Sequence, residues 1–334
     1  MSNRVGQAAN KALRSVLGFA AARVASSDRL MSVVYDLMNE TNFAGLSEHE
    51  EMLSDSVRVQ AYHHGIHRNV QPGDVVVDLG TGTGLLAFMA SRAGARKVYA
   101  VEHSDIIDIA REIAQHNGFT NIEFVRANSR EFTPPERVDV VLHEQMGDEL
   151  FNENMVQNLL DVRDRFLRPH GRILPAKFRL FIEPVSLHEP MRVRRFWNIE
   201  LPDGIDLAPM RGSHAAGRID TGRNEQIWLR PGSVAATFGT PVPVMEFDLD
   251  TLADASALPT DFVVERTASH DMIVDGTCIW FEAQFDDHTV LSTSPLSPLT
   301  SWGNRLYRLD RLFSKGEQLR IDVHLPRLLD PDTW

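Results

Sequence analysis

The stretch from Val75 to Gly84, which reads VVVDLGTGTG, decides the fold of the first half of this chain. Three consecutive valines are typical of a strand that is buried on both faces. Asp78 follows at the strand tip, and Gly80, Gly82 and Gly84 let the backbone turn sharply and come close to a ligand. Because apolar residues follow the glycines, the stretch predicts a strand, a glycine-rich loop and the start of a helix.

The glycine spacing excludes the nicotinamide dinucleotide fingerprint. G-x-G-x-x-G, counted from Gly80 and Gly82, requires a third glycine where Leu85 stands. The loop resembles instead motif I of the S-adenosylmethionine (AdoMet) methyltransferases, which wraps around the amino-acid end of AdoMet and binds no phosphate. Glu102 closes the next predicted strand at the acidic position, about 20 residues on, that binds a ribose diol. A glycine-rich turn without a ligand stays open as the alternative.

Composition narrows the class of protein. The chain has 334 residues, 43% of them hydrophobic and 24% charged, so it can form two domains or one large one. Its 34 basic and 46 acidic residues give a net charge of −12, which argues against nucleic-acid binding and is compatible with a cationic substrate. The single Cys278 excludes an internal disulfide and argues against a thiolate metal site, and we expect no metal. The apolar run 16–22 is too short for a membrane span, so we expect a cytoplasmic protein without a membrane partner.

Strand and helix patterns alternate between residues 71 and 175. The predicted strands lie at 75–77, 97–101, 122–125, 138–143 and 172–174, and the main helices at 106–116 and 152–167. This order predicts an α/β class with a doubly wound, Rossmann-like AdoMet-binding domain over 71–175. Residues 1–70 are expected to form N-terminal helices, including one continuous helix from His49 through Tyr62.

The pattern of hydrophobic and polar residues changes after Pro175. Short alternating runs such as 178–182, 245–249 and 278–285 predict an antiparallel, β-barrel-like domain over residues 176–334. Within it, the stretch 192–212 contains Phe196-Trp197 and many prolines and glycines. It fits neither a strand nor a compact turn and is expected to form an excursion.

The loop after the strand ending at His143 reads EQMGDELFNENM over residues 144–155. Ligands bind at the carboxyl edge of such a sheet, so Glu144 should face the same crevice as Asp78 and Glu102. The loop resembles the double-E loop of the protein arginine methyltransferases, in which two glutamates clamp the guanidinium to be methylated. The match makes Glu144 and Glu153 the catalytic pair. For Glu153, an acid in the first turn of a helix is the structural alternative.

Two more segments carry this resemblance. HEEML, starting at His49, is followed by Arg58, and SPLSPLTSW at 294–302 resembles the family's Thr-His-Trp loop. The four motifs occur in the family's order over roughly residues 40–330. The resemblance also implies a homodimer that is joined by an arm at 192–212.

The resemblance implies a role for each matched residue. As contacts to AdoMet it gives Arg58 for the carboxylate and Asp78, Gly80 and Gly82 for the methionine end, then Glu102 for the ribose and Ser129 for adenine. As contacts to the substrate it gives Met146 and Trp302, to which we add Asp148. A solvated helix face for Arg58, a core position for Met146 and Trp302, and a loop cap for Asp148 remain the structural alternatives.

Several positions depart from the family's pattern. Gln145 and Asp148 stand in place of Trp and Tyr, Arg130 stands where the family often has Glu, and Ser301 replaces the loop histidine. The aspartate that pairs with this histidine is expected at Thr41, so both members of the pair are predicted to be absent. The N-terminal aromatic motif is replaced too, by Asn39, Glu40 and Phe43. These changes around an intact clamp indicate a changed substrate.

The predicted function is AdoMet-dependent N-methylation of an arginine guanidinium. Free L-arginine or a small guanidino compound is favoured over protein arginine, because the Asp148 carboxylate could receive an α-ammonium group. The main alternative is a small-molecule O-methyltransferase that uses His143 or Glu144 as a base, and a non-catalytic subunit is a further one. The fold alone does not decide among them.

Overall fold

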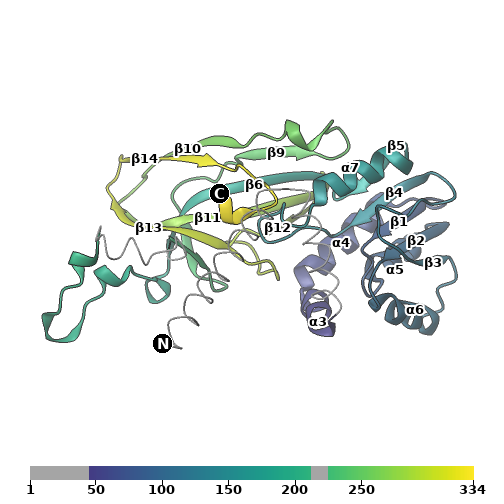
Figure 1. Ribbon diagram of the computed structural model, residues 1–334, viewed down its shortest axis with the longest axis horizontal. Helices are drawn as coiled ribbons and strands as arrows, with labels where there is room; N and C mark the ends of the chain where they lie inside the picture. The colour runs from purple at the N-terminus through teal and green to yellow at the C-terminus, as the bar shows by residue number, and fades with distance from the viewer. Residues whose placement is uncertain (1–44, 212–224) are drawn as a thin grey trace, which may run out of the picture.

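The computed structural model describes residues 45–211 and 225–334, except for the side chain of Phe196. The helices predicted within residues 1–38 lie outside the described residues, as do Asn39, Glu40, Thr41 and Phe43. The parallel sheet lies at one end of the molecule, and the antiparallel strands occupy the middle (Figure 1).

The parallel sheet has five strands in the order β3-β2-β1-β4-β5. They are β1 (Val75–Leu79), β2 (Lys97–Glu102), β3 (Ile122–Arg126), β4 (Val138–His143) and β5 (Leu167–Leu174). The helices α5 (Leu85–Arg92), α6 (Ile106–His116) and α7 (Met155–Phe166) connect them. All four pairings are parallel, which confirms the Rossmann-like prediction. Every residue of β1 is buried, as its run of valines predicts.

Two predicted helix boundaries are wrong. The helix expected from His49 through Tyr62 is two helices, α3 (Leu46–Ser54) and α4 (Ser56–Asn69), because Asp55 between them has extended backbone angles. Asp55 caps α4 by accepting a hydrogen bond from the backbone N–H of Arg58 at 2.9 Å. The helix expected from residue 152 begins at Met155. Glu153 therefore lies in the loop before α7 and not in its first turn.

The part of the chain from β6 to the C-terminus, here called the β domain, is antiparallel, as predicted. A seven-stranded sheet contains β6 (Lys177–Leu187), β7 (Gln226–Trp228), β8 (Val234–Thr237), β9 (Met245–Asp248), β11 (Met272–Asp286), β12 (Thr289–Ser292) and β13 (Arg305–Phe313). A separate pair is formed by β10 (Asp261–Thr267) and β14 (Gln318–His324). Leu319 of β14 is buried in one cluster with Val274 and Phe313, which joins this pair to the sheet.

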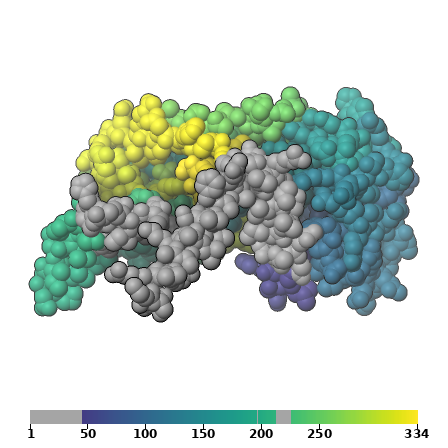
Figure 2. Space-filling model, in the orientation of Figure 1, coloured from purple at the N-terminus to yellow at the C-terminus, as the bar shows by residue number. Residues whose placement is uncertain are grey.

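The stretch expected as an excursion forms short 3-10 turns and projects from the end of the molecule opposite the parallel sheet (Figure 2). Within it lie η2 (Phe196–Asn198), η3 (Pro202–Gly204) and η4 (Ala208–Met210), and η1 (Glu189–Met191) directly precedes it. Its root is tied to β13, since Arg308 donates to the carbonyl of Val193 at 2.7 Å and Asn198 to Asp310 at 2.8 Å. We call the described part, residues 192–211, the arm.

Within residues 45–211 and 225–334, no helix combines the length and the apolar character that a membrane crossing requires. The same ranges contain no group of three or more His, Cys, Asp or Glu side chains that could hold a metal ion.

Candidate active site

A cavity of about 500 Å³ lies at the carboxyl edge of the parallel sheet. Seven of the residues singled out from the sequence line it, namely Arg58, Gly80, Gly82, Glu102, Ser129, Glu144 and Glu153. They come from α4, from the end of β2 and from the loops after β1, β3 and β4. The parallel topology thus brings them together at one edge of the sheet. Asp78, Met146, Asp148 and Trp302 do not line the cavity.

The glycine loop forms the floor of the cavity. Gly80 and Gly82 have φ angles of +70° and +52°, in the left-handed region that favours glycine. A Cβ atom at Gly80 would have only Gln145 Nε2 near it, at 3.9 Å, so it would enter open space. At Gly82 a Cβ atom would lie 3.0 Å from the ring of His49. The loop is packed on the His49 side and is open to a ligand at Gly80.

Asp78 stabilises the glycine loop through hydrogen bonds. Its Oδ2 accepts hydrogen bonds from the Thr81 hydroxyl at 2.5 Å and from the Ala87 backbone N–H at 3.1 Å. It is fully buried, and this burial raises its pKa to about 7, although the two hydrogen bonds act to lower it. Asp78 therefore links the glycine loop to α5. Its predicted contact with the methionine end stays a prediction.

Glu102 stands at the end of β2 with its carboxylate fixed by backbone donors. Gly82 donates to Oε2 at 3.1 Å and Ser104 donates to Oε1 at 2.9 Å. The side chain is almost fully buried but contributes to the wall of the cavity. An immobilised carboxylate at this place can accept hydrogen bonds from a diol.

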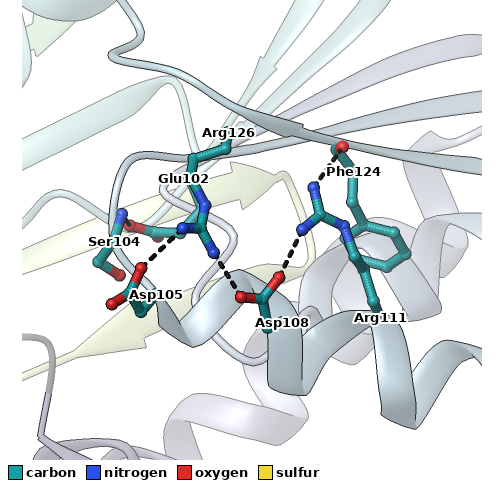
Figure 3. Close-up of polar contacts among 7 residues, drawn as sticks. All are labelled: Glu102, Ser104, Asp105, Asp108, Arg111, Phe124 and Arg126. Atoms are coloured by element: carbon teal, nitrogen blue, oxygen red, sulfur yellow. Dashed lines mark hydrogen bonds and ion pairs between the residues drawn. The ribbon is translucent and has the colours of Figure 1, made fainter.

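The cavity edge beside Glu102 is held by an ion-pair network (Figure 3). Arg126, the neighbour of Glu102 in the register of β2 and β3, pairs with Asp105 at 2.7 Å and Asp108 at 2.6 Å. Asp108 also pairs with Arg111 at 2.6 Å. These contacts hold the Arg126 guanidinium toward the start of α6.

The predicted adenine side is held by α7. Arg165 donates to the carbonyls of Ser129 at 2.8 Å and Phe132 at 2.6 Å. Arg130, which also lines the cavity, donates to Asn158 at 3.4 Å. The loop after β3 is thus positioned by the same helix that follows the double-E loop.

Glu144 holds a guanidinium in this structure, that of Arg58. The Arg58 guanidinium also lies over the Trp302 ring, with Cζ 4.9 Å from the centroid, and donates to the sulfur of Met52 at 3.3 Å. Burial raises the pKa of Glu144 above its ordinary value, and the charge of Arg58 opposes this rise. A carboxylate and an aromatic face therefore hold a guanidinium at the cavity.

Glu153 faces the same cavity from the turn before α7. The two glutamates of the double-E loop thus reach one space from opposite ends of the loop. Their catalytic role stays a prediction, and the geometry is compatible with it.

The prediction that both members of the histidine–aspartate pair are absent is wrong for the aspartate. Asp55 Oδ2 accepts hydrogen bonds from the Ser301 backbone N–H at 2.7 Å and from its hydroxyl at 3.1 Å. The carboxylate that faces Ser301 thus comes from Asp55, at the start of α4, and not from the position of Thr41. Only the histidine has been replaced, and the contact between the two segments is kept.

Met146 and Trp302 are both buried, and neither lines the cavity. The Trp302 indole N–H donates to the Met146 carbonyl at 2.7 Å, and its ring packs edge-on against Phe281 at 5.7 Å. Trp302 contacts the site through Arg58, whose guanidinium stacks on the Trp302 ring. Both residues have the core positions that were their structural alternative, and their contact with a substrate stays a prediction.

Asp148 accepts a hydrogen bond from the backbone N–H of Gly303 at 2.7 Å. Burial raises its pKa, while this hydrogen bond lowers it. The contact is the loop cap that was its structural alternative. A role in binding an α-ammonium group gains no support from this position.

His143 is unsuited to act as a base. It is fully buried, and its Nε2 lies 2.8 Å from the carbonyl oxygen of Pro175, to which it donates. Burial lowers its pKa to about 4, and it does not line the cavity. The O-methyltransferase alternative therefore keeps only Glu144 as a base.

The sequence reasoning missed Asn158. This residue of α7 lines the cavity and donates to the Gln145 side chain at 3.3 Å. It occupies the same helix face as the buried Met155 and Val162, three residues before it and four after. A polar residue on an otherwise apolar helix face was the signal that could have revealed it.

Comparisons with known proteins point to one family. Residues 76–171 match the family model described as a methyltransferase domain. Protein arginine N-methyltransferase 6 of Danio rerio is 32% identical over 298 residues, which cover 86% of this chain and 83% of that protein. A probable histone-arginine methyltransferase CARM1 of Oryza sativa subsp. indica is 32% identical over 300 residues, covering 85% of this chain and 55% of that longer relative.

A solved structure agrees. The Trypanosoma brucei PRMT1 enzyme-prozyme heterotetrameric complex with AdoHcy superposes with a TM-score of 0.69 at 26% identity, covering 84% of this chain and 88% of that one. The similarity extends over both the parallel sheet and the β domain.

Proposed function

Because the chain belongs to the protein arginine methyltransferase family, we propose that this AdoMet-dependent enzyme methylates the guanidinium of arginine residues in polypeptides. The observation that carries the proposal is the guanidinium held by Glu144 beside Trp302, in a cavity that Glu153 also lines. This guanidinium belongs to Arg58 in the cavity wall, so Glu144 binds a planar cation at the cavity, and Glu153 adds a second carboxylate to the lining.

The chemistry follows from the residue types. A guanidinium stays charged at neutral pH and has five donors in a planar fork, so one carboxylate can bind it in two places while a second accepts from another edge. Two carboxylates draw the delocalised charge toward the nitrogens that they bind. The remaining nitrogen would regain lone-pair character and could take the methyl group in line with the sulfonium sulfur, which would leave as a neutral thioether while the nitrogen gives up one proton to a carboxylate or to water. Positioning by Glu144 and Glu153 then supplies much of the rate.

The cavity fits AdoMet. A Cβ atom at Gly80 would protrude into the cavity, and Glu102 presents a carboxylate that two backbone N–H groups fix. In this proposal the glycine loop holds the methionine end, Glu102 the ribose and the Ser129 loop the adenine. When bound, AdoMet supplies an activated methyl group on a sulfonium. Arg58 has donors enough to bind a ligand carboxylate while it holds Glu144.

The methyl acceptor can be either free arginine or an arginine in a polypeptide. The sequence favoured free L-arginine because of Asp148, but this carboxylate accepts from Gly303 and does not line the cavity. The relatives are named as protein and histone arginine methyltransferases. Both observations favour an arginine within a polypeptide over the free amino acid.

We expect labelled AdoMet to transfer its methyl group to an arginine-rich peptide at least tenfold faster than to free L-arginine at equal concentration. The measurement is incorporation of label, with mass spectrometry of both acceptors. The matched control is the same peptide with lysine in place of arginine, which should stay unlabelled. Methylation of free arginine alone would restore the small-molecule acceptor.

We also propose that the enzyme is a homodimer joined by the arm. Val193, Ile199, Ile205 and Met210 are all exposed on the arm, and such a group of apolar side chains usually marks an interface. The contacts of Arg308 and Asn198 at its root give the arm a fixed direction.

We expect the double variant Ile199→Asp/Ile205→Asp to be monomeric where the wild type is a dimer, because the charges oppose burial of the arm. Light scattering at micromolar concentration measures this. Val263→Asp is the control, since Val263 is similarly exposed on β10, and it should leave the dimer intact. A monomeric wild type at this concentration contradicts the proposal.

A further inference from the structure

Two segments distant in the sequence are joined beside the active site. Residues 146–149 belong to the double-E loop, and residues 302–305 lead into β13 of the β domain. Trp302 donates to the Met146 carbonyl, and Gly303 donates to Asp148, both at 2.7 Å. An ion pair between Glu149 and Arg305 is the next contact along the two segments. We call these three contacts the clasp.

The ion pair of the clasp is almost completely buried. Arg305 Nε lies 2.6 Å from Glu149 Oε1, and the two side chains are 11% and 2% exposed. The contact is an ion pair without hydrogen-bond geometry. Nη1 of Arg305 also pairs with Asp332 at 2.7 Å and donates to Gln226 at 2.7 Å. The guanidinium also lies 5.0 Å from the centre of the Trp228 ring. Arg305 is therefore held in one orientation from several sides.

Neither member of this pair belongs to the machinery described above. Glu149 and Arg305 do not line the cavity, so they do not contact a substrate placed there. A buried ion pair is weak as a source of stability, because desolvation offsets most of the attraction. The main consequence of this ion pair is therefore its effect on the geometry of the double-E loop.

The double-E loop depends on such outside contacts. Between Glu144 and Met155 the backbone is irregular, with positive φ angles at Leu150 (75°) and Asn154 (56°). Its internal backbone contacts are few and short-range, such as the bridge between Gly147 and Leu150. A loop without a strand or helix of its own takes its position from the side chains that tie it to rigid elements.

We infer that Glu149 and Arg305 are positioning residues, whose ion pair fixes the double-E loop against the β domain so that Glu144 and Glu153 face one acceptor. The inference rests on the proposed function and names two residues that set the geometry of its clamp. It also gives the acidic residues after Gly147 a task other than substrate binding. The parallel sheet holds the cofactor side of the cavity, whereas the β domain sets the acceptor side.

The test uses the full chain with Arg305→Met, which removes the charge but keeps the length of the side chain. We expect kcat with an arginine-rich peptide to fall roughly 10- to 100-fold, since a displacement of about 1 Å can cost this much. The affinity for AdoMet should stay within about twofold, because the glycine loop and Glu102 are untouched. Arg305→Lys should recover part of kcat. Arg320→Met, at an exposed arginine of β14, is the control and should match the wild type.

A second variant separates positioning from an unpaired buried charge. Glu149→Gln/Arg305→Met removes both charges together, so it leaves neither uncompensated. We expect its kcat to stay low, because the tie between the segments is still missing. A return of kcat to the wild-type value would overturn the inference.

Hydrogen exchange gives a readout that does not depend on activity. In Arg305→Met, amides of residues 144–154 should exchange at least several-fold faster, while those of β1 and β4 should not change. Unchanged exchange in the loop, or a kcat within twofold of the wild type, overturns the inference. If the wild type itself methylates no arginine, the proposed function fails, and loop exchange still decides whether the clasp holds the loop.

Discussion

Glu144→Gln is expected to abolish methyl transfer to arginine while AdoMet still binds. The substitution keeps the size of the side chain and removes one charge from the clamp. Glu144 holds the Arg58 guanidinium in this structure, so its carboxylate demonstrably faces a planar cation beside Trp302. Loss of one charged partner in a water-poor site costs several kcal/mol, on the order of 10² to 10⁴ in rate.

Glu153→Gln should have a similar effect, and it offers the cleaner comparison because Glu144 and Arg58 are left in place. Steady-state kinetics give kcat, and titration calorimetry gives the affinity for AdoMet, which should stay within a few-fold of the wild type. Glu246→Gln, at an exposed residue of β9 that does not line the cavity, is the matched control. Near-normal turnover in either clamp variant would remove the guanidinium assignment.

The features fixed by local sequence were predictable. The valines before Asp78 require a buried parallel strand, and the glycines after it have the positive φ angles that their spacing indicates. The helix 106–116 has its predicted ends, because apolar residues recur along one face and Gly118 follows its last turn. Because ligands bind at the carboxyl edge of a parallel sheet, the strand order alone predicts that Glu102 and Glu144 face one cavity, and both line it.

The break between α3 and α4 was missed because helical patterning runs through it on both sides. The local signal is the run Ser54-Asp55-Ser56, whose residue types are common at helix N-caps but also on solvated helix faces. The role of Asp55 depends on Ser301, which is 246 residues away and binds its second oxygen. A cap that also holds a distant loop can be recognised only when both partners are seen.

The same limit explains the misplacement of the aspartate at Thr41. Motif spacing is counted along the chain, whereas the contact forms between the start of α4 and the loop before β13. The contacts of the clasp also join segments that are far apart in the sequence. In the sequence, Glu149 is one of several acidic residues in its loop, and Arg305 is one of several charged residues on its strand. Only the structure shows that the two side chains lie 2.6 Å apart.

Gly80→Val is expected to eliminate AdoMet binding itself, before any chemistry. Gly80 has a φ angle of +70°, which a β-branched residue adopts only with strain. Its Cβ atom would stand in the open cavity, near Gln145 Nε2 at 3.9 Å, where the methionine end is proposed to lie. The side chain thus occupies ligand space as well as straining the loop.

The control for this substitution is Gly118→Val. Gly118, in the turn after α6, has a φ angle of +73° and no heavy atom within 4 Å of a Cβ position, so valine there brings the same backbone strain without filling the cavity. Both variants should lose on the order of 1 to 2 kcal/mol of folding stability, measured by chemical denaturation. Only Gly80→Val should lose AdoMet binding in calorimetry. If both variants bind AdoMet equally well, the glycine loop does not hold the cofactor where we place it. If both fail equally, backbone strain alone accounts for the loss.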